Sequence, residues 1–322
     1  MAVAWYQASR GNAVGTERQL EKAHRRLLAY VPSHRALDVA GVLHSVTRAR
    51  GTFPSLPAPV VGDALPGGPD LERALAFMAD LQERSAVERT PFRFGHVYGD
   101  PERPALWDLN FARLERPVAD VDPDEVASAV DEIERTVGHR HRKLFVADPR
   151  AAVALEPRFR TLGWRIERYL VMGLVAVPGE GAHPVLEVDD AALVASRRAF
   201  AAGEDPNASD DVVAQLADFA VSRRRAVDIH LFAHVEGNLP VSWCELYSGG
   251  GVGQVEDVAT LREHRGRGFA SSVVARAARA SVEAGHDLTF LVVDEDDGPV
   301  VLYERLGFSA VGREYAFFKP PL

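Results

Sequence analysis

The pattern of apolar and polar positions changes from strand to helix between residues 255 and 277. Residues 255–260 are mostly apolar and β-branched and carry one acidic pair, Glu256 and Asp257, which is typical of a strand. From Phe269 onward, apolar side chains recur at the spacing of a helix face. The segment between them, residues 261–268, therefore predicts a loop that leads from a strand into a helix.

This loop carries the residues needed to hold a pyrophosphate. The first turn of a helix leaves backbone N–H groups unpaired and carries the positive end of the helix dipole. Gly266 and Gly268 have no Cβ to keep a phosphate away from the backbone, and Arg265 and Arg267 add positive charge. A Walker A loop would need a Lys-Ser/Thr pair, and a Rossmann fingerprint would need three glycines; the loop has neither.

Two motifs in the C-terminal part of the chain resemble those of a known family. The run Arg265-x-x-Gly268-x-Ala270, directly after a strand, resembles the Q/R-x-x-G-x-G/A signature of the GNAT superfamily of acyl-CoA-dependent N-acyltransferases. Downstream, residues 302–308 read Leu-Tyr-Glu-Arg-Leu-Gly-Phe, which is similar to the family's tyrosine-bearing helix and the Gly-Phe pair after it. The order and separation of the two motifs favour the acyl-CoA interpretation over a glycine loop that is only a tight turn.

The resemblance covers nearly all of residues 185–322 and implies an α/β (α+β) fold, a mixed, mostly antiparallel, twisted sheet flanked by helices. It also implies acetyl-CoA, or another acyl-CoA, as the co-substrate, with no metal. The contacts to CoA that it implies are Val258, Ala259, Thr260, Arg265, Gly266, Arg267, Gly268, Phe269, Ala270 and Ser271.

Acyl transfer to an amine requires a base, because an alkyl amine with a pKa of about 10.4 is protonated at neutral pH. Glu256 occupies the place of a base proposed for polyamine acetyltransferases of the family, and Asp257 is the reserve. Strand alternation predicts that these two side chains point to opposite faces. A carboxylate paired with a neighbouring arginine is the alternative interpretation of Glu256.

Tyr303 is the candidate acid that hydrogen-bonds or protonates the departing thiolate, the role that the resemblance implies for it. A core aromatic with a satisfied hydroxyl is the alternative. Backbone N–H groups near residues 258–260 would polarise the thioester carbonyl, and attack is expected to be direct, in a ternary complex. Cys244, the only cysteine, is expected to be a buried structural thiol.

An earlier part of the chain resembles the C-terminal part at a spacing of about 144 residues. Residues 144–148 and 160–164 correspond to 291–294 and 305–308. The earlier copy has no glycine in residues 115–122, where acidic side chains would cap the next helix and repel a phosphate, and Phe159 replaces Tyr303. The sequence thus predicts two GNAT-like lobes, of which the first binds no CoA.

The expected domains are an N-terminal helical extension and linker at 1–67, a degenerate GNAT-like lobe at 68–178 and the acyltransferase domain at 185–322. A formal charge of −9 argues against nucleic-acid binding, and no apolar run is long enough to span a membrane, so we expect a cytoplasmic protein. His230 and His234 lie four apart but lack further metal ligands, and the basic run 138–143 is expected to be a solvated helix end.

The sequence therefore predicts an N-acyltransferase that moves an acetyl group to a primary amine, with its active site in the C-terminal lobe. A small-molecule amine is the favoured acceptor, and a protein lysine or N-terminus stays open. A noncatalytic acyl-CoA-binding module, sensory or regulatory, is the alternative. The chain is expected to be a monomer or a homodimer.

Overall fold

The computed structural model describes Leu65 and residues 67–115, 122–296 and 299–321. The predicted helical extension at 1–67 lies outside the described residues except for Leu65 and Gly67. The N-terminal half of the described chain comprises α4 (Pro69–Ser85), β1 (Glu88–Phe92), β2 (Gly95–Gly99), β3 (Phe111–Leu114), α5 (Pro123–Thr136), β4 (Arg142–Val146), α6 (Pro149–Thr161) and β5 (Arg165–Leu174).

The C-terminal half follows after the linker at 178–184. It comprises β6 (Leu186–Val188), α7 (Asp190–Glu204), α8 (Asp210–Ala217), α9 (Phe219–Arg223), β7 (Asp228–Glu236), β8 (Leu239–Gly249), β9 (Val252–Thr260), a short 3-10 helix η1 (Arg262–His264), α10 (Phe269–Glu283), β10 (Leu288–Asp294), α11 (Val300–Arg305) and β11 (Phe308–Lys319). The strand, loop and helix predicted around residues 255–277 are therefore present.

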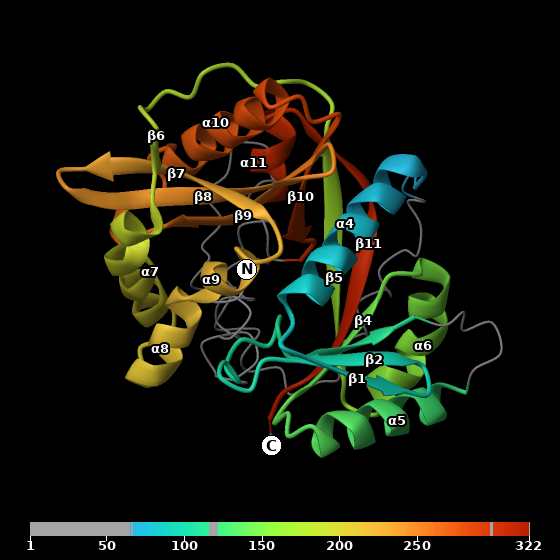
Figure 1. The fold of residues 1–322 in the computed structure, drawn as a ribbon. Helices are drawn as coiled ribbons and strands as arrows, with labels where there is room; N and C mark the ends of the chain where they lie inside the picture. The colour runs from blue at the N-terminus through green and yellow to red at the C-terminus, as the bar shows by residue number, and fades with distance from the viewer. Residues whose placement is uncertain (1–64, 66, 116–121, 297–298, 322) are drawn as a thin grey trace, which may run out of the picture. The chain divides into compact units, whose positions relative to one another are not determined.

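The strands of both halves form one sheet of 11 strands, in the order β1-β2-β3-β4-β11-β5-β10-β9-β8-β7-β6 (Figure 1). Neighbouring strands are antiparallel except for two parallel pairs, β3 with β4 and β9 with β10. The mixed, mostly antiparallel sheet that the family resemblance implied is therefore confirmed.

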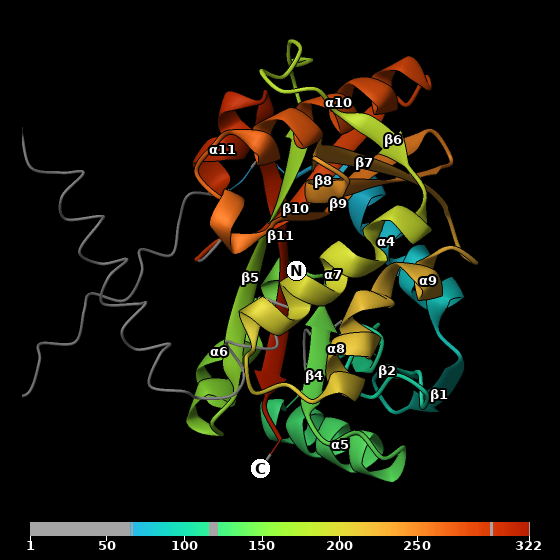
Figure 2. The same cartoon turned by 90° about the vertical axis from the view of Figure 1, so that its left-hand side faces the viewer.

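The two halves exchange a strand at the centre of this sheet. Strand β11, the last of the C-terminal half, lies between β4 and β5, while β5, the last of the N-terminal half, lies between β11 and β10. The two strands run side by side over most of their length in Figures 1 and 2, paired from Arg165 with Phe318 to Leu174 with Phe308. Each half therefore completes its part of the sheet with a strand from the other.

Side chains on these central strands alternate between two covered faces. On β11, Tyr315 and Phe317 pack with α5 and α6, whereas Ala316 and Phe318 pack toward α4 on the opposite face. Strand β10 follows the same rule: Leu291 packs under α10 and α11, and its neighbours on either side pack on the face of α4. We call these the α10 face, which α5, α6, α10 and α11 cover, and the α4 face, which α4 and α7–α9 cover.

Most of the longer helices begin with a side chain that caps them, and α10 does not. The caps of α5, α6, α7 and α8 are Asp122, Asp148, Asp189 and Ser209, each accepting a hydrogen bond from a backbone N–H of the first turn. Helix α10 begins at Phe269 after Gly268, which has a left-handed conformation, and like α4 it has no side-chain cap. Its first-turn N–H groups are therefore open to an external acceptor.

The basic run at 138–143 is a solvated helix end only in its first part, where Gly138 and Arg140 follow α5 and are exposed; for the rest of the run that expectation was wrong. The run leads into β4, which lies inside the sheet, so His141 and Lys143 are both buried. Lys143 forms an ion pair with Asp108, and burial lowers the pKa of His141 to about 3. The end of the run is thus the start of an interior strand, in which Arg142 pairs with Asp131 and Lys143 with Asp108.

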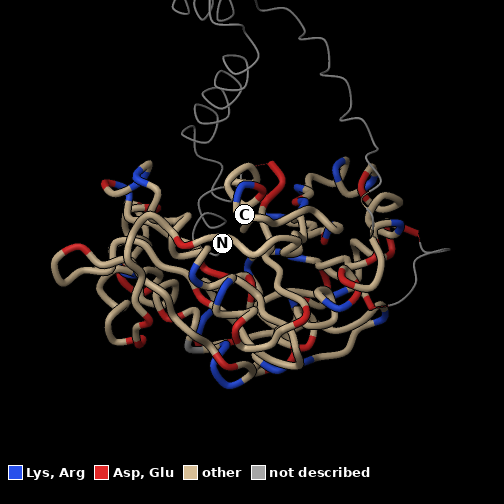
Figure 3. Tube along the Cα trace, turned by 90° about the horizontal axis from the view of Figure 1, so that it is seen from above, with Lys and Arg blue, Asp and Glu red and all other residues tan. Residues whose placement is uncertain are grey.

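Seen from above, Lys and Arg are interspersed with Asp and Glu along the trace (Figure 3). Within the described ranges, no helix has both the length and the apolar character needed to cross a bilayer.

Candidate functional site

The central feature of the site is a gap that opens between β9 and β10. Their parallel pairing runs from Val252 with Leu288 to Val255 with Leu291 and then stops, although β9 continues to Thr260 and β10 to Asp294. An opening between two strands gives an extended ligand access to a free strand edge. In the N-terminal half the corresponding strands β3 and β4 stay paired to their last residues, Leu114 and Val146.

A bulge in β9 lies at the start of this gap. The pairing of β8 with β9 shifts between Glu245–Glu256 and Trp243–Ala259, and Asp257 has a positive φ of 48°. This extra residue interrupts the alternation of the strand. As a result, Glu256 and Asp257 both line the same cavity, and the prediction that they point to opposite faces is wrong.

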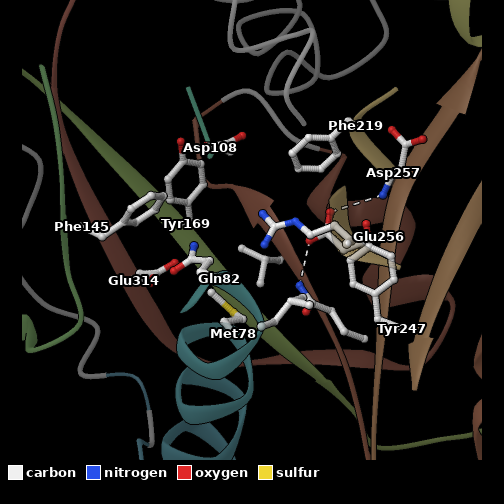
Figure 4. Close-up of a pocket in the computed structure, with 14 residues that line it drawn as sticks. Met78, Gln82, Asp108, Phe145, Tyr169, Phe219, Tyr247, Glu256, Asp257 and Glu314 are labelled. Carbon is white, nitrogen blue, oxygen red and sulfur yellow. Dashed lines mark hydrogen bonds between the residues drawn. The ribbon is translucent and has the colours of Figure 1, made fainter. Parts of the chain in front are cut away.

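The cavity lies on the α4 face, next to the gap, and has a volume of about 80 Å³. In Figure 4, Asp108, Phe145, Tyr169 and Glu314 lie on one side of it and Phe219, Tyr247, Glu256 and Asp257 on the other, with α4 below. Both halves contribute: α4, β4 and β5 come from the first half, and α9, β8, β9 and β11 from the second. The full lining is Met78, Leu81, Gln82, Asp108, Phe145, Tyr169, Phe219, Arg223, Tyr247, Gln254, Glu256, Asp257, Val292 and Glu314.

Glu256 lies in this cavity with only neutral hydrogen-bond donors around its carboxylate. Gln254 Nε2 donates to Oε1 at 2.8 Å and the Asp257 N–H donates to Oε2 at 3.3 Å, the two dashed lines that end on Glu256 in Figure 4. Desolvation raises the pKa of Glu256 above its ordinary value, against the opposing charge of Arg223. Among the described residues no cation lies within ion-pair distance of Glu256, so the ion-pair interpretation has no partner there.

Asp257 is held more firmly than Glu256. Trp243 Nε1 donates to its Oδ2 at 3.0 Å, and the Nε of Arg197 lies 3.9 Å from the same oxygen. Arg197 also pairs with Glu245, whose pKa burial and the Asp257 charge raise to about 7, although Arg197 and Tyr247 lower it. Asp257 is therefore fixed by a tryptophan and an arginine, whereas Glu256, among the described residues, accepts hydrogen bonds only from neutral donors.

Tyr303 lies on the other side of the sheet, on the α10 face. Its ring belongs to the buried cluster that includes Val255 and Leu291, the last paired residues of β9 and β10, and meets the Phe308 ring edge-on, with ring centroids 6.4 Å apart. Its hydroxyl has no hydrogen bond among the described residues. Desolvation, with a smaller contribution from the Glu256 charge, raises the pKa of Tyr303 far above 10, so the phenol keeps its proton at neutral pH.

The candidate pyrophosphate loop has the backbone geometry expected for it. Gly266 and Gly268 have φ values of 78° and 85°, in the left-handed region where a side chain is strained. A Cβ on Gly266 would meet nothing within 4 Å, so this side of the loop is open. The predicted contact residues Phe269, Ala270 and Ser271 form the uncapped first turn of α10.

Both arginines of the loop already have partners. Arg265 Nη2 lies 2.5 Å from Glu204 Oε1, and its Nε donates to the Thr260 carbonyl at 3.0 Å. Arg267 Nη2 lies 2.5 Å from Glu236 Oε1. Both arginines are about half exposed, so these ion pairs contribute little to stability and could be replaced by pairs with a phosphate. The uncapped first turn of α10 is therefore the part of the predicted phosphate site that has no competing partner among the described residues.

Several cavity residues were missed by the sequence analysis. Arg223 ends a short helix in an Arg-Arg-Arg run that looks solvent-exposed, and nothing in its pattern marks it as buried. The position of Glu314 in its strand, by contrast, indicates that it is buried. It occupies the same face of β11 as Ala316 and Phe318, so it is an acidic residue at an inward position, and burial raises its pKa to about 7.

Three other expectations concern residues outside the cavity. Asp122 caps α5, as predicted for the acidic loop of the first half, with its carboxylate accepting from the Asp124 N–H at 3.0 Å. Cys244 is fully buried, as predicted, and its thiol donates to the Val273 carbonyl. His230 bonds to Glu187, and the described ranges hold no group of three or more side chains placed to bind a metal.

Comparison with known proteins gives three findings. The model of the FR47-like protein family matches residues 232–317. The N-alpha-acetyltransferase MAK3 of Arabidopsis thaliana is 34% identical over 67 residues, which is 20% of this chain and 35% of that protein. The match thus spans about a third of the relative's length.

Solved structures give the same fold over a much longer span. A GCN5-related N-acetyltransferase from Kribbella flavida is 22% identical, with a TM-score of 0.55 over 79% of this chain and 96% of its own. A conserved protein of unknown function from Staphylococcus epidermidis is 15% identical, with a TM-score of 0.57 over 74% and 94%. The similarity in fold therefore includes the N-terminal half as well as the part that carries the motifs.

Proposed function

The chain belongs to the GNAT superfamily, and on that premise we propose that it transfers an acetyl group from acetyl-CoA to a primary amine in its C-terminal half. One observation carries the proposal. The pairing of β9 with β10 ends at Val255 and Leu291. Glu256, the next residue of β9, lines the cavity on the α4 face, whereas Tyr303 lies in the buried cluster of the α10 face that contains Val255 and Leu291. The candidate base and the candidate acid thus lie on opposite faces of the sheet, next to the point where the two strands part.

Acetyl-CoA fits the features of the C-terminal half. The uncapped N-terminus of α10 would receive the pyrophosphate, with Gly266 and Gly268 allowing close approach of the backbone. The free edge of β9 at residues 258–260 would pair with the pantetheine and polarise the thioester carbonyl through a backbone N–H. When bound, acetyl-CoA supplies the activated acetyl group.

The chain's own residues would then move two protons. Glu256 receives a proton from the ammonium of the acceptor, so that the neutral amine can attack from the α4 face. As the N–C bond forms and the C–S bond breaks, Tyr303 donates its phenolic proton to the departing sulfur. The nitrogen loses its second proton to solvent as the amide forms. Solvent then returns a proton to the Tyr303 phenolate and takes the proton from Glu256, so that one proton is released in each turnover. No acyl-enzyme is needed, and the buried Cys244, whose pKa is raised by desolvation, is a poor nucleophile.

The N-terminal half would serve as scaffold and as one wall of the acceptor cavity. Its strands β3 and β4 do not part, and Asp122 already caps the helix that would face a phosphate. This supports the division into a degenerate lobe at 68–178 and a working domain at 185–322, although the exchanged strands couple the two. The name of the relative MAK3 points to protein N-termini as one class of acceptor.

The test is the release of free CoA thiol from acetyl-CoA in the presence of primary amines, compared between the native protein and Glu256→Gln. The proposal predicts saturable, amine-dependent release and a loss of kcat in the variant of about 10²-fold or more at neutral pH. Tight acetyl-CoA binding with no turnover on any amine would instead support the alternative, a noncatalytic acyl-CoA-binding module.

A further inference from the structure

The cavity contains one buried arginine whose donors are not used. Arg223, at the end of α9, is only 6% exposed and lines the cavity, yet its Nε and Nη1 have no hydrogen-bond partner. Two other buried arginines have carboxylate or carbonyl partners. Arg197 pairs with Asp190 and Glu245 through its two terminal nitrogens, although its Nε has no hydrogen bond in the described part of the chain, and Arg113 donates to the Ala79 carbonyl and to Gln82.

The carboxylates around Arg223 do not supply its missing partner. Asp108 pairs with Lys143, and Asp257 accepts from Trp243. Glu256 accepts from neutral donors, and no carboxylate of the described residues lies within 4.0 Å of the Arg223 guanidinium. Because leaving the N–H groups of a buried guanidinium unpaired is costly, the arrangement calls for an external anion.

We propose that the acceptor is a small zwitterion, an amine that also carries a carboxylate, which Arg223 binds while the amine lies at Glu256. This inference rests on the proposed acetyl transfer. A planar carboxylate matches the fork of a guanidinium, which can donate two parallel hydrogen bonds to it. The positively charged amine of the same molecule would lie in the rest of the cavity, which Glu256, Asp257 and Glu314 make acidic.

The walls between these two ends fit a short carbon skeleton. Phe219, Tyr247, Phe145 and Met78 present rings and a thioether to the cavity. Arg223 lies close enough to Glu256 to lower its pKa. A peptide N-terminus would place an uncharged amide where the carboxylate is expected, and a polyamine would place a second cation there. Both would leave Arg223 unpaired.

The test compares amines that differ only in the carboxylate, with the native protein and acetyl-CoA. The pairs are glycine with methylamine, β-alanine with ethylamine, and 4-aminobutyrate with propylamine, alongside putrescine and an N-terminal peptide amide. We expect at least one amino acid to exceed its partner in kcat/KM by about 10- to 100-fold, the size of one hydrogen-bonded charge pair. Preference for the plain amines, for putrescine or for the peptide would overturn the inference.

Variants test whether Arg223 causes the preference for a carboxylate. Arg223→Gln should abolish the preference for a carboxylate and leave acetyl-CoA binding unchanged, and Arg223→Lys should retain part of the preference. The control Arg198→Gln removes the same charge at an exposed position and should leave the preference intact. A preference that survives Arg223→Gln would overturn the assignment. If the variant does not fold, the paired amines still decide the question with the native protein.

The two proposals fail in different ways. Turnover of amines with no advantage for a carboxylate refutes the zwitterionic acceptor and leaves acetyl transfer intact. Acetyl-CoA binding with no acetylation of any of these amines also refutes it. A protein that neither binds acetyl-CoA nor releases CoA refutes the proposed function itself.

Discussion

Replacing Tyr303 with phenylalanine should lower turnover without weakening acetyl-CoA binding or the fold. The substitution keeps the ring in the buried cluster that includes Val255 and Leu291, and it removes a hydroxyl that has no hydrogen bond among the described residues. We therefore expect the free energy of unfolding to change by less than about 1 kcal/mol. The dissociation constant of acetyl-CoA should change by less than about twofold.

The expected loss of kcat follows from the chemistry of the leaving group. General acid catalysis contributes about 10²- to 10⁴-fold, and a thiolate with a pKa near that of cysteine, about 8.5, leaves with little help at neutral pH. The low end of the range applies, so we expect about a 10²-fold loss, or about 2.7 kcal/mol of activation free energy. Because the pKa of the Tyr303 phenol is raised far above 10, kcat of the native protein should not fall through ionisation of Tyr303 below about pH 10.

The assay is steady-state release of CoA thiol, with calorimetric titration of acetyl-CoA and thermal unfolding measured on the same samples. Tyr315→Phe is the matched control, because Tyr315 is also buried but packs with α5 and α6, away from the gap. A Tyr303→Phe variant with unchanged kcat, or one in which acetyl-CoA affinity falls together with kcat, would show that the tyrosine is structural.

Three further predictions concern the fold. Gly307→Ala should destabilise the fold by about 3 kcal/mol or more, because its Cβ would lie 2.0 Å from the Ala176 carbonyl oxygen. The control Gly163→Ala, at the same kind of turn with open space around it, should cost about 1 kcal/mol. Equal losses of stability in chemical denaturation would refute this prediction. Glu314→Gln should stabilise the fold by up to about 3 kcal/mol at pH 8 and by almost nothing at pH 4. The pKa of Glu314 is about 7 in the folded state against 4.5, so the native carboxyl destabilises the fold increasingly as pH rises through that window, and a pH-independent effect in urea titrations would contradict this. Residues 185–322 produced alone should not fold, because β10 and β11 then lack β5 between them; a cooperative thermal transition of this fragment would refute the role assigned to the exchange.

The local structure around the C-terminal motifs was predictable because short-range patterns determine it. The strand, loop and helix from Val255 to Ala277 follow from periodicity, and the two glycines of the loop adopt the positive φ values for which glycine is suited. The acidic cap of α5 also followed from composition, since an aspartate before a Pro-Asp-Glu start caps its own helix.

What the sequence did not reveal depends on contacts between distant segments. Alternation failed at Asp257 because a bulge against β8 adds one residue to β9, and no local pattern specifies a bulge. The repeat at a spacing of about 144 residues suggested two similar lobes, but strand order is a property of long-range pairing, so the exchange of β5 and β11 could not be inferred. Arg223 is buried only because α4 and the sheet enclose the end of α9.

The central claim is that acetyl-CoA binds to the C-terminal half through the loop before α10. Calorimetric titration of acetyl-CoA into the native protein, Gly268→Asp and the control Gly138→Asp tests it most directly, since both glycines have similar positive φ values, 85° and 87°, and only one lies at the proposed phosphate site. The account predicts one site per chain that Gly268→Asp abolishes and Gly138→Asp retains. Binding that survives Gly268→Asp would contradict it.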